Sequence, residues 1–101
     1  MKMYILILDD LPNGHAINGA AHAALACYIK YGYQPEFQDW LKNSFKKVTC
    51  KVSKEEFTKA MSLESYFTVM TESSLGGRET CVAFMPRETW DPLFKTFQLW
   101  K

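Results

Sequence analysis

The chain has 101 residues, of which 48% are hydrophobic and 23% charged, and its formal net charge is +1. This length fits one domain, residues 1–101, and is sufficient for folding without disulfides or metals. The composition excludes a disordered chain, and the near-neutral charge gives no general sign of nucleic-acid binding, although it leaves a local basic patch open. Three widely spaced cysteines, Cys27, Cys50 and Cys81, form no Cys-x-x-Cys pair, so we expect buried, reduced thiols and a cytoplasmic protein.

The first predicted elements are a strand and a long helix. Met3 to Leu8 is a run of six apolar residues, too short to span a membrane and typical of a central strand. Turn residues 12–14 end this strand. His15 to Tyr31 contains six alanines and predicts a helix that packs closely on the sheet, because small side chains permit a short helix–sheet distance. The residues expected to face the core are Ile17, Ala20, Ala21, Ala24, Tyr28 and Tyr31.

The remaining elements follow in an order that indicates the fold class. They are a helix at Pro35–Leu41, a strand at Lys46–Val52, a helix opened by the capping box Ser53–Glu56, strands at Tyr66–Thr71 and Thr80–Met85 joined by a hairpin-like link, and a helix from Pro86 through Phe94. The order β-α-(α)-β-α-β-β-α predicts an α/β fold with three layers, α/β/α, around a four-stranded mixed sheet.

A cluster of polar side chains is expected where the first strand ends. His15, Asn18 and His22 are spaced by three and four residues, so they lie on one stripe of the helix. Two carboxylates, Asp9 and Asp10, end the strand, and ligand crevices in open α/β sheets lie at the carboxyl ends of strands. Together with the free N–H groups of the helix, this place suits an anion, a phosphate or a developing oxyanion. The alternative is that His22 lies at the edge of the core and that Asp10 only terminates a strand.

Glu72 and Ser73 follow the third predicted strand and form a second candidate. If that strand lies beside the first and parallel to it, Glu72 reaches the same crevice and would orient a histidine as a base. The alternative is a solvent-exposed, serine-rich turn. A metal bound by both His15 and His22 is not expected, because roughly 10 Å of helix separates them while zinc ligands lie about 2 Å from the metal. No cofactor is expected either, since the chain has no phosphate loop or dinucleotide-binding motif.

Several segments, in chain order, match the pattern of a known family. Asp10-Leu11 after an apolar strand, then Gly14 and the helix stretch Ala20 to Ala24, look like the opening of type 2 peptidyl-tRNA hydrolases. Residues 46–56 resemble the second strand and third helix of that family, and residues 80–86 and 95–99 resemble its last strand and final segment. The resemblance spans nearly the whole chain. It implies hydrolysis of the ester bond of peptidyl-tRNA, tRNA as a partner, and a homodimer.

The chain departs from the family pattern at three places. The family usually has Lys where His15 stands and Gln where Gly19 stands, and only Gly77-Arg78 is similar to its Asp-Ala-Gly-Arg-Thr stretch. His15 would partly replace the lysine when protonated, and Glu72 would keep a carboxylate nearby.

Two hypotheses about function follow. The first is an esterase that acts on peptidyl-tRNA or a related acyl ester, and the second is a catalytically inactive binding module for an unknown ligand on the same fold. The expected catalytic residues are His22, Asp10 and Glu72, and the expected substrate-binding residues are His15, Gly14, Asn18 and Ser73. The shared Asp-Gly-His framework favours the esterase, whereas the changes to His15 and Gly19 favour the binding module.

Overall fold

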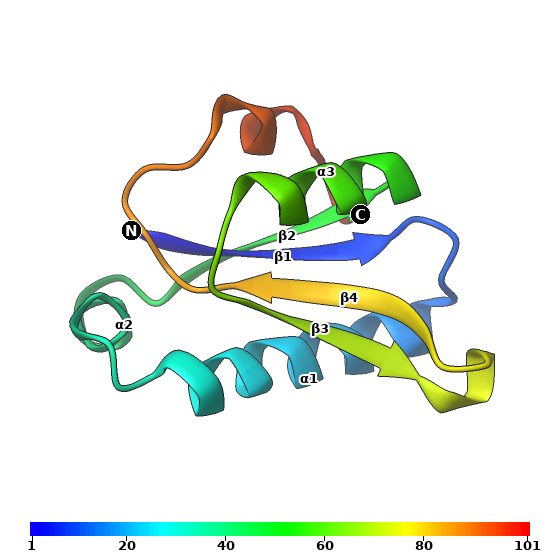
Figure 1. Ribbon diagram of the computed structural model, residues 1–101, viewed down its shortest axis with the longest axis horizontal. Coiled ribbons are helices and arrows are strands. Elements are labelled where there is room, and N and C mark those ends of the chain that lie inside the picture. Colours follow the sequence, from blue (N-terminus) through cyan, green and yellow to red (C-terminus); the bar gives the residue numbers. More distant parts are fainter.

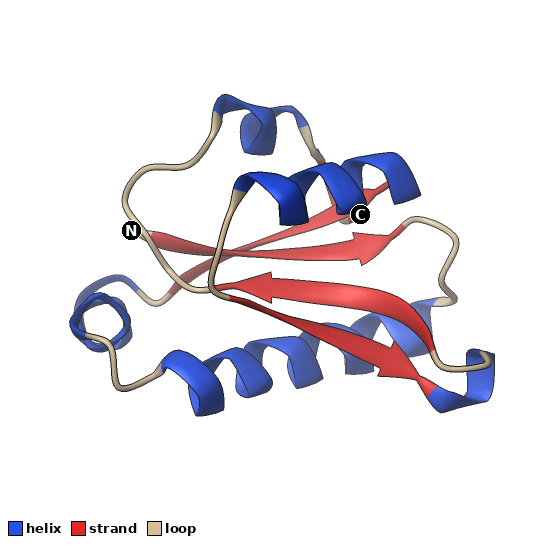
Figure 2. Ribbon diagram, viewed as in Figure 1, coloured by secondary structure: helices blue, strands red, loops and turns tan.

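A mixed sheet in the strand order β3-β4-β1-β2-β5 forms the centre of the protein, which a computed structural model describes over residues 1–101 (Figure 1). The strands are β1 (Lys2–Leu8), β2 (Lys46–Val52), β3 (Phe67–Glu72), β4 (Arg78–Phe84) and β5 (Gln98–Leu99). The helices are α1 (Asn13–Tyr31), α2 (Pro35–Asp39) and α3 (Lys54–Leu63), with a π-helical turn η1 (Trp40–Ser44) and two 3-10 turns, η2 (Ser73–Leu75) and η3 (Pro92–Thr96). Helix α1 covers one face of the sheet, and α3 covers the other with η3 (Figure 2).

The predicted α/β class and the mixed sheet are confirmed, but the prediction of four strands is wrong. A fifth strand, β5, pairs with the outer edge of β2 in antiparallel orientation, with Cys50 opposite Leu99 and Lys51 opposite Gln98. A strand of two residues is too short to show the alternating pattern from which strands are predicted. It forms because the edge of β2 offers unpaired backbone groups.

The predicted closing helix is also wrong. After β4 the chain runs irregularly past Pro86 and forms only the short turn η3, which Asp91 opens by accepting a hydrogen bond from the backbone N–H of Leu93 at 2.9 Å. Trp90 and Phe94 are buried nonetheless. Their apolar spacing therefore reflects packing of irregular backbone against the sheet. Over so few residues, this spacing cannot be distinguished from that of a helix.

Helix α1 packs closely on the sheet, as predicted, but with a different face. Ile17 is 68% exposed, and the buried residues are Ala16, Ala23 and Cys27. A Cβ atom added to Gly19 would lie 2.4 Å from the sulfur of Cys81 in β4, so the helix backbone almost touches the strand. Of the residues expected in the core, Ala21 and Tyr28 are exposed as well, while Ala20, Ala24 and Tyr31 are half-buried. Alanines on all sides of the helix give little contrast between an apolar face and a polar one, so the sequence indicates the face poorly.

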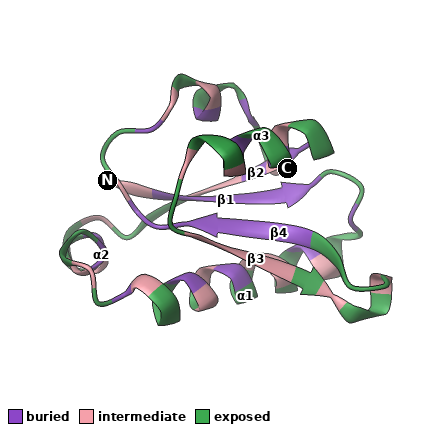
Figure 3. Ribbon diagram, viewed as in Figure 1, coloured by how far each residue is buried: buried purple, intermediate pink, exposed green.

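The opposite face of the sheet is packed with aromatic side chains. The ring of Phe94 lies 5.0 Å from those of Tyr4 and Trp90 and 5.3 Å from that of Phe84, measured between centroids. β1 and β4 lie in the middle of the sheet between the two layers and are almost wholly buried (Figure 3). The capping box that opens α3 is confirmed, since the side chains of Ser53 and Glu56 each bond to the other's backbone N–H.

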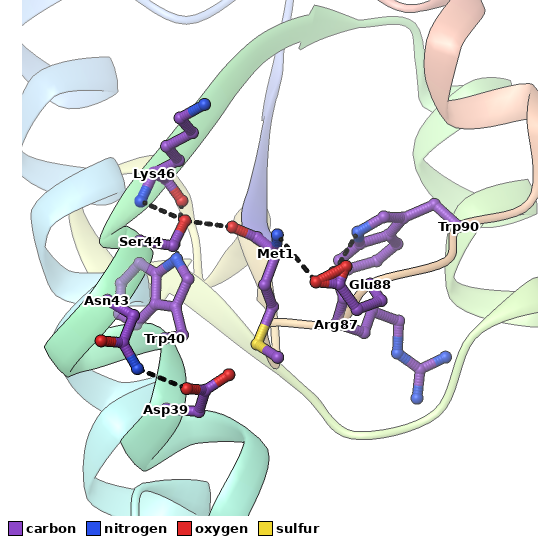
Figure 4. A network of polar contacts seen from close by, with 9 residues as sticks. All are labelled: Met1, Asp39, Trp40, Asn43, Ser44, Lys46, Arg87, Glu88 and Trp90. Atoms are coloured by element: carbon purple, nitrogen blue, oxygen red, sulfur yellow. Dashed lines mark hydrogen bonds and ion pairs between the residues drawn. The ribbon is translucent and has the colours of Figure 1, made fainter.

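Polar contacts at one end of the sheet join the start of β1 to η1 and to the segment after β4 (Figure 4). The amino group of Met1 lies 3.3 Å from the carboxylate of Glu88, and the carbonyl of Met1 accepts a hydrogen bond from the hydroxyl of Ser44. The indole of Trp40 donates to the carbonyl of Lys46 at 2.8 Å. These contacts fix the start of the central strand and leave the carboxyl ends of β1 and β3 at the other end of the molecule.

None of the helices is both long enough and apolar enough to cross a membrane. The three cysteines are free and buried, as predicted.

Candidate active site

Four chain segments meet at the far end of the sheet from Met1 (Figure 1). β1 ends at Leu8, α1 begins at Asn13, β3 ends at Glu72 and β4 begins at Arg78. β3 does not lie beside β1, because β4 lies between them. It nevertheless runs in the same direction as β1, since β4 is antiparallel to both. The carboxyl ends of β1 and β3 therefore lie at the same end of the molecule, the arrangement in which Glu72 can reach the crevice.

Asp10 forms an ion pair with Arg78 at this end. The guanidinium Nη2 of Arg78 donates a hydrogen bond of 2.6 Å to Oδ1 of Asp10. This hydrogen bond lowers the pKa of Asp10 below its ordinary value, and the same contact raises the pKa of Arg78. Asp10 is thus held as a carboxylate by an arginine that the sequence analysis did not assign to the site.

A β-bulge directs Arg78 toward this site. The register of β3 and β4 shifts so that Thr80 of β4 has no partner in β3. On the far side of this bulge, Arg78 pairs with Glu72. Paired residues project to the same face of a sheet, so Arg78 shares the face of Glu72, which is the face covered by α1. Cys81, which also faces α1, is three positions after Arg78, and in a regular strand that spacing would place the two on opposite faces. Bulges commonly redirect side chains in this way next to active sites.

Glu72 lies beside His15 of α1. Its Oε1 atom accepts a hydrogen bond of 2.7 Å from the hydroxyl of Ser74 and lies 4.0 Å from Nδ1 of His15. The hydrogen bond from Ser74 is the largest cause of a lowered pKa for Glu72, and the charges of His15 and His22 lower that pKa further. Ser74 therefore contacts the carboxylate, and Ser73 does not.

The first turn of α1 offers free backbone donors. Pro12 precedes the helix without a side-chain hydrogen bond to it, and the first turn contains no acidic residue. The N–H groups of residues 13–15 have no partner within the helix, because the first intrahelical bond runs from the N–H of Ala16 to the carbonyl of Pro12 at 2.9 Å. Gly14 is exposed, and a Cβ atom there would meet nothing within 4 Å. An anionic group can therefore approach these donors closely.

Asp10, His15 and Glu72 are thus brought to one place, together with Arg78 and Ser74. His22 is exposed about two turns further along α1 than His15 and influences Glu72 through its charge, without a hydrogen bond to it. Asn18 and Ser73 are exposed and form no side-chain hydrogen bond. The only signal in the sequence for Arg78 was its place in the Gly77-Arg78 pair that resembles the family's arginine-containing stretch.

This arrangement combines an imidazole beside a carboxylate with a guanidinium and free N–H donors. The imidazole and the carboxylate suit proton transfer, and the donors suit a developing negative charge. Such a set of groups is appropriate to hydrolysis of an acyl ester.

Comparison with known proteins agrees with this chemistry. No curated protein matches the chain significantly. A family model described as peptidyl-tRNA hydrolase PTH2, however, matches residues 1–100, which is almost the whole chain. The chain belongs to the peptidyl-tRNA hydrolase PTH2 family.

Proposed function

We propose that the protein hydrolyses the ester bond between a peptidyl group and tRNA, in the crevice between the start of α1 and the ends of β1 and β3. The observation that carries this proposal is the approach of the Glu72 carboxylate to His15, 4.0 Å away, at an uncapped helix N-terminus. Membership of the PTH2 family supports the substrate class.

In the proposed mechanism, His22 is the general base and Glu72 assists it. The hydrogen bond from Ser74 lowers the pKa of Glu72 and so holds it in its charged form, and this charge, without a direct contact, stabilises the positive charge that forms on His22 during the reaction. His22 accepts a proton from a water molecule as the water oxygen bonds to the ester carbonyl carbon. The bond from that carbon to the ribose oxygen then breaks, and the proton passes from His22 to this oxygen. The products are a peptide with a free carboxyl group and a tRNA with a free hydroxyl group.

The donors at the start of α1 stabilise the negative charge of the intermediate in this mechanism. The backbone N–H groups of residues 13–15 bind the oxyanion, and His15 and Gly14 line this position. Asp10 fixes Arg78 through one of the guanidinium donors, so the other donors remain for the substrate. Asn18 and Ser73 are exposed beside the crevice, where we propose that they contact the substrate.

The test is release of free tRNA from a peptidyl-tRNA substrate by the wild type and by single variants. We expect His22→Ala to lower kcat by roughly 10²- to 10⁴-fold, the usual contribution of a general base. Glu72→Gln should lower kcat less, and Lys59→Ala, an exposed position on α3, should leave it unchanged. An equally large loss with His15→Ala and none with His22→Ala would transfer the role of base to His15. If the wild type releases no tRNA, the esterase proposal fails and the inactive binding module on the same fold remains.

We also infer that two copies associate through the C-terminal half of α1. An apolar groove of about 390 Å³ lies between α1 and the α2–η1 segment, and nine of its ten lining residues are hydrophobic. Leu25 lines this groove, and Ile29, which is 74% exposed, lies one turn further along α1. Contiguous apolar surfaces of this kind mark protein contacts, and a second copy would present the same surface in return. Light scattering should give the mass of a dimer, and Leu25→Glu should give a monomer. A monomeric wild type would refute this inference.

The free, buried thiols support a reducing compartment, which we propose is the cytoplasm. Burial raises the pKa of Cys27 to about 12 and that of Cys50 to about 11, so neither thiol is readily oxidised in the folded protein. Detection of the native protein only in a secreted fraction would contradict this location.

A further inference from the structure

A second cavity lies beside the first turns of α1. It has a volume of about 340 Å³, within the range of small-ligand pockets. Its lining residues are Ile7 of β1, Thr49 of β2, Ala16, Ile17 and Ala20 of α1, and Trp100. Because β3 and β5 are opposite edges of the sheet, this cavity and the Glu72 carboxylate lie on opposite sides of α1. The cavity and the Glu72 carboxylate both lie beside the first two turns of α1, which contain His15.

Trp100 is held in place by backbone pairing. Its N–H group donates a hydrogen bond of 2.9 Å to the carbonyl of Thr49, which continues the pairing of β5 with β2. The side chain is only partly buried, and it forms the wall of the cavity across from Ala16 and Ala20. The cavity is therefore bounded by an indole on one side and by small side chains of α1 on the other.

One lysine, Lys51, lies beside this cavity. The amino group of Lys51 lies 4.7 Å from the centroid of the Trp100 ring, and Lys51 belongs to none of the four ion pairs of the protein. Neither α1 nor β2 contains an Asp or a Glu, whereas β2 contains three lysines. Asp9, whose backbone N–H donates to the carbonyl of Val52 next to Lys51, forms no ion pair with Lys51. Lys51 is therefore a lysine without a carboxylate partner beside this cavity, whereas the other two lysines of β2 lie at the start of the strand.

We propose that this cavity binds the 3′-terminal nucleoside of the tRNA, with the base stacked on Trp100 and the adjoining phosphate at Lys51. This inference rests on the proposed function. The ester of peptidyl-tRNA joins a peptidyl arm to the 3′-terminal nucleoside, and in the proposed mechanism its carbonyl group lies at the start of α1. On the side of α1 that faces Asp10 and Glu72, two carboxylates stand against one arginine, Arg78, which Asp10 already pairs, so this side attracts phosphate less. The side that faces Trp100 carries a free lysine and a flat aromatic surface, the two features that bind single-stranded nucleic acid.

The peptidyl arm then extends toward Asp10 and Glu72. Lys51 covers the indole in the free protein, and on binding its amino group moves from the ring to the phosphate while the base takes its place. Stacking of a base on an aromatic side chain tolerates any base, because every base has a π-face. The proposed contact therefore recognises the terminal nucleoside by its position and not by its sequence.

The test measures equilibrium binding of two uncharged tRNAs, one intact and one without its 3′-terminal nucleotide. We expect removal of this nucleotide to weaken binding to the wild type by roughly 5- to 150-fold, the usual effect of one stacked base. Trp100→Leu should bind both tRNAs with similar, weak affinity, and Trp100→Phe should restore most of the difference. Thermal unfolding of each variant shows that the fold is retained.

Lys51→Ala tests the phosphate contact separately. It should reduce the slope of log K against log salt concentration by about 0.7, the value for one phosphate contact on a single strand. Lys59→Ala, which removes an exposed lysine from α3 on the other face of the sheet, should leave the slope unchanged. An unchanged slope for Lys51→Ala, or equal discrimination between the two tRNAs by the wild type and by Trp100→Leu, would overturn the inference. So would a wild type that binds neither tRNA.

These outcomes are distinct from those that concern hydrolysis. If the terminal nucleotide strengthens binding to the wild type but not to Trp100→Leu, and the wild type releases no tRNA from peptidyl-tRNA, this inference is upheld and the esterase proposal is refuted. A KM that varies with the peptidyl group for the wild type, and no longer varies for Trp100→Leu, would assign the cavity to the peptidyl arm and refute the inference.

Discussion

The two faces of the sheet are packed by different kinds of side chain. On the face covered by α3 and η3, aromatic rings of Tyr4, Phe84, Trp90 and Phe94 lie in mutual contact at 4.9 to 6.0 Å between centroids. On the face covered by α1, the helix contributes small buried residues, and Gly19 leaves too little room for a Cβ atom beside Cys81. The first face therefore buries large apolar areas, while the second allows a close approach of helix and sheet.

This difference indicates that the stability of the domain and the geometry of the site depend on different faces of the sheet. Large rings supply most of the apolar area removed from water. Small residues supply little area, but they let α1 approach the sheet so that its first turns come within reach of Glu72 at the end of β3. Substitutions on the aromatic face should therefore alter the free energy of unfolding, and substitutions on the α1 face should alter the site as well.

The largest expected effect is on the aromatic face. Phe94 is 1% exposed, and Phe94→Ala should lower the free energy of unfolding by about 3–5 kcal/mol, because it removes a buried ring and leaves a cavity. Denaturation in urea measures this change. Tyr33→Ala, at a position that is 77% exposed, is the control and should change stability little. A loss below about 1 kcal/mol for Phe94→Ala would show that this face is not the main source of stability.

A smaller effect is expected on the α1 face. Gly19→Ala gains up to about 1 kcal/mol in helix propensity, but its Cβ atom would overlap the sulfur of Cys81, and such overpacking costs about 1–3 kcal/mol. We expect a net destabilisation of about 1 kcal/mol and reduced hydrolysis, since α1 must shift away from β4.

The double variant Gly19→Ala, Cys81→Ala sharpens this prediction. It removes the sulfur, and the nearest remaining atom, the Cβ of residue 81, lies at 3.6 Å, which is an ordinary contact. A double-mutant cycle should therefore show favourable coupling between the two substitutions. Additive effects of the two substitutions would contradict the close approach.

The smallest effect on stability is expected for the ion pair of Asp10 and Arg78, because both side chains are largely accessible to solvent. The folded-state pKa of Asp10 is lowered, so the pair contributes stability above the unfolded pKa of about 3.9 and loses it as pH falls through the folded value. Arg78→Ala should lower the melting temperature slightly at pH 7 and not at pH 2. A difference that persists unchanged at pH 2 would show that Arg78 acts by packing.

Much of the fold could be predicted from local patterns in the sequence. The apolar run Met3–Leu8, the alternating segment Lys46–Val52 and the capping box at Ser53 each correspond to observed elements, because each is decided by neighbouring residues. The same holds for the prediction that the alanine-rich helix packs closely. Asp10, Glu72 and His15 were assigned to one crevice from their places at the ends of elements, and the structure brings them to the same end of the sheet.

The remaining features depend on contacts between distant parts of the chain. β5 exists because the edge of β2 is available to it, and Arg78 reaches Asp10 because a bulge in β4 reverses the face on which it projects. The face of α1 that is buried depends on where Cys81 lies, and the wall that Trp100 forms depends on its bond to Thr49. Local sequence determines which residues can form a helix or a strand, but register and helix–sheet distance arise only when the elements pack together, since they minimise the free energy of the whole domain.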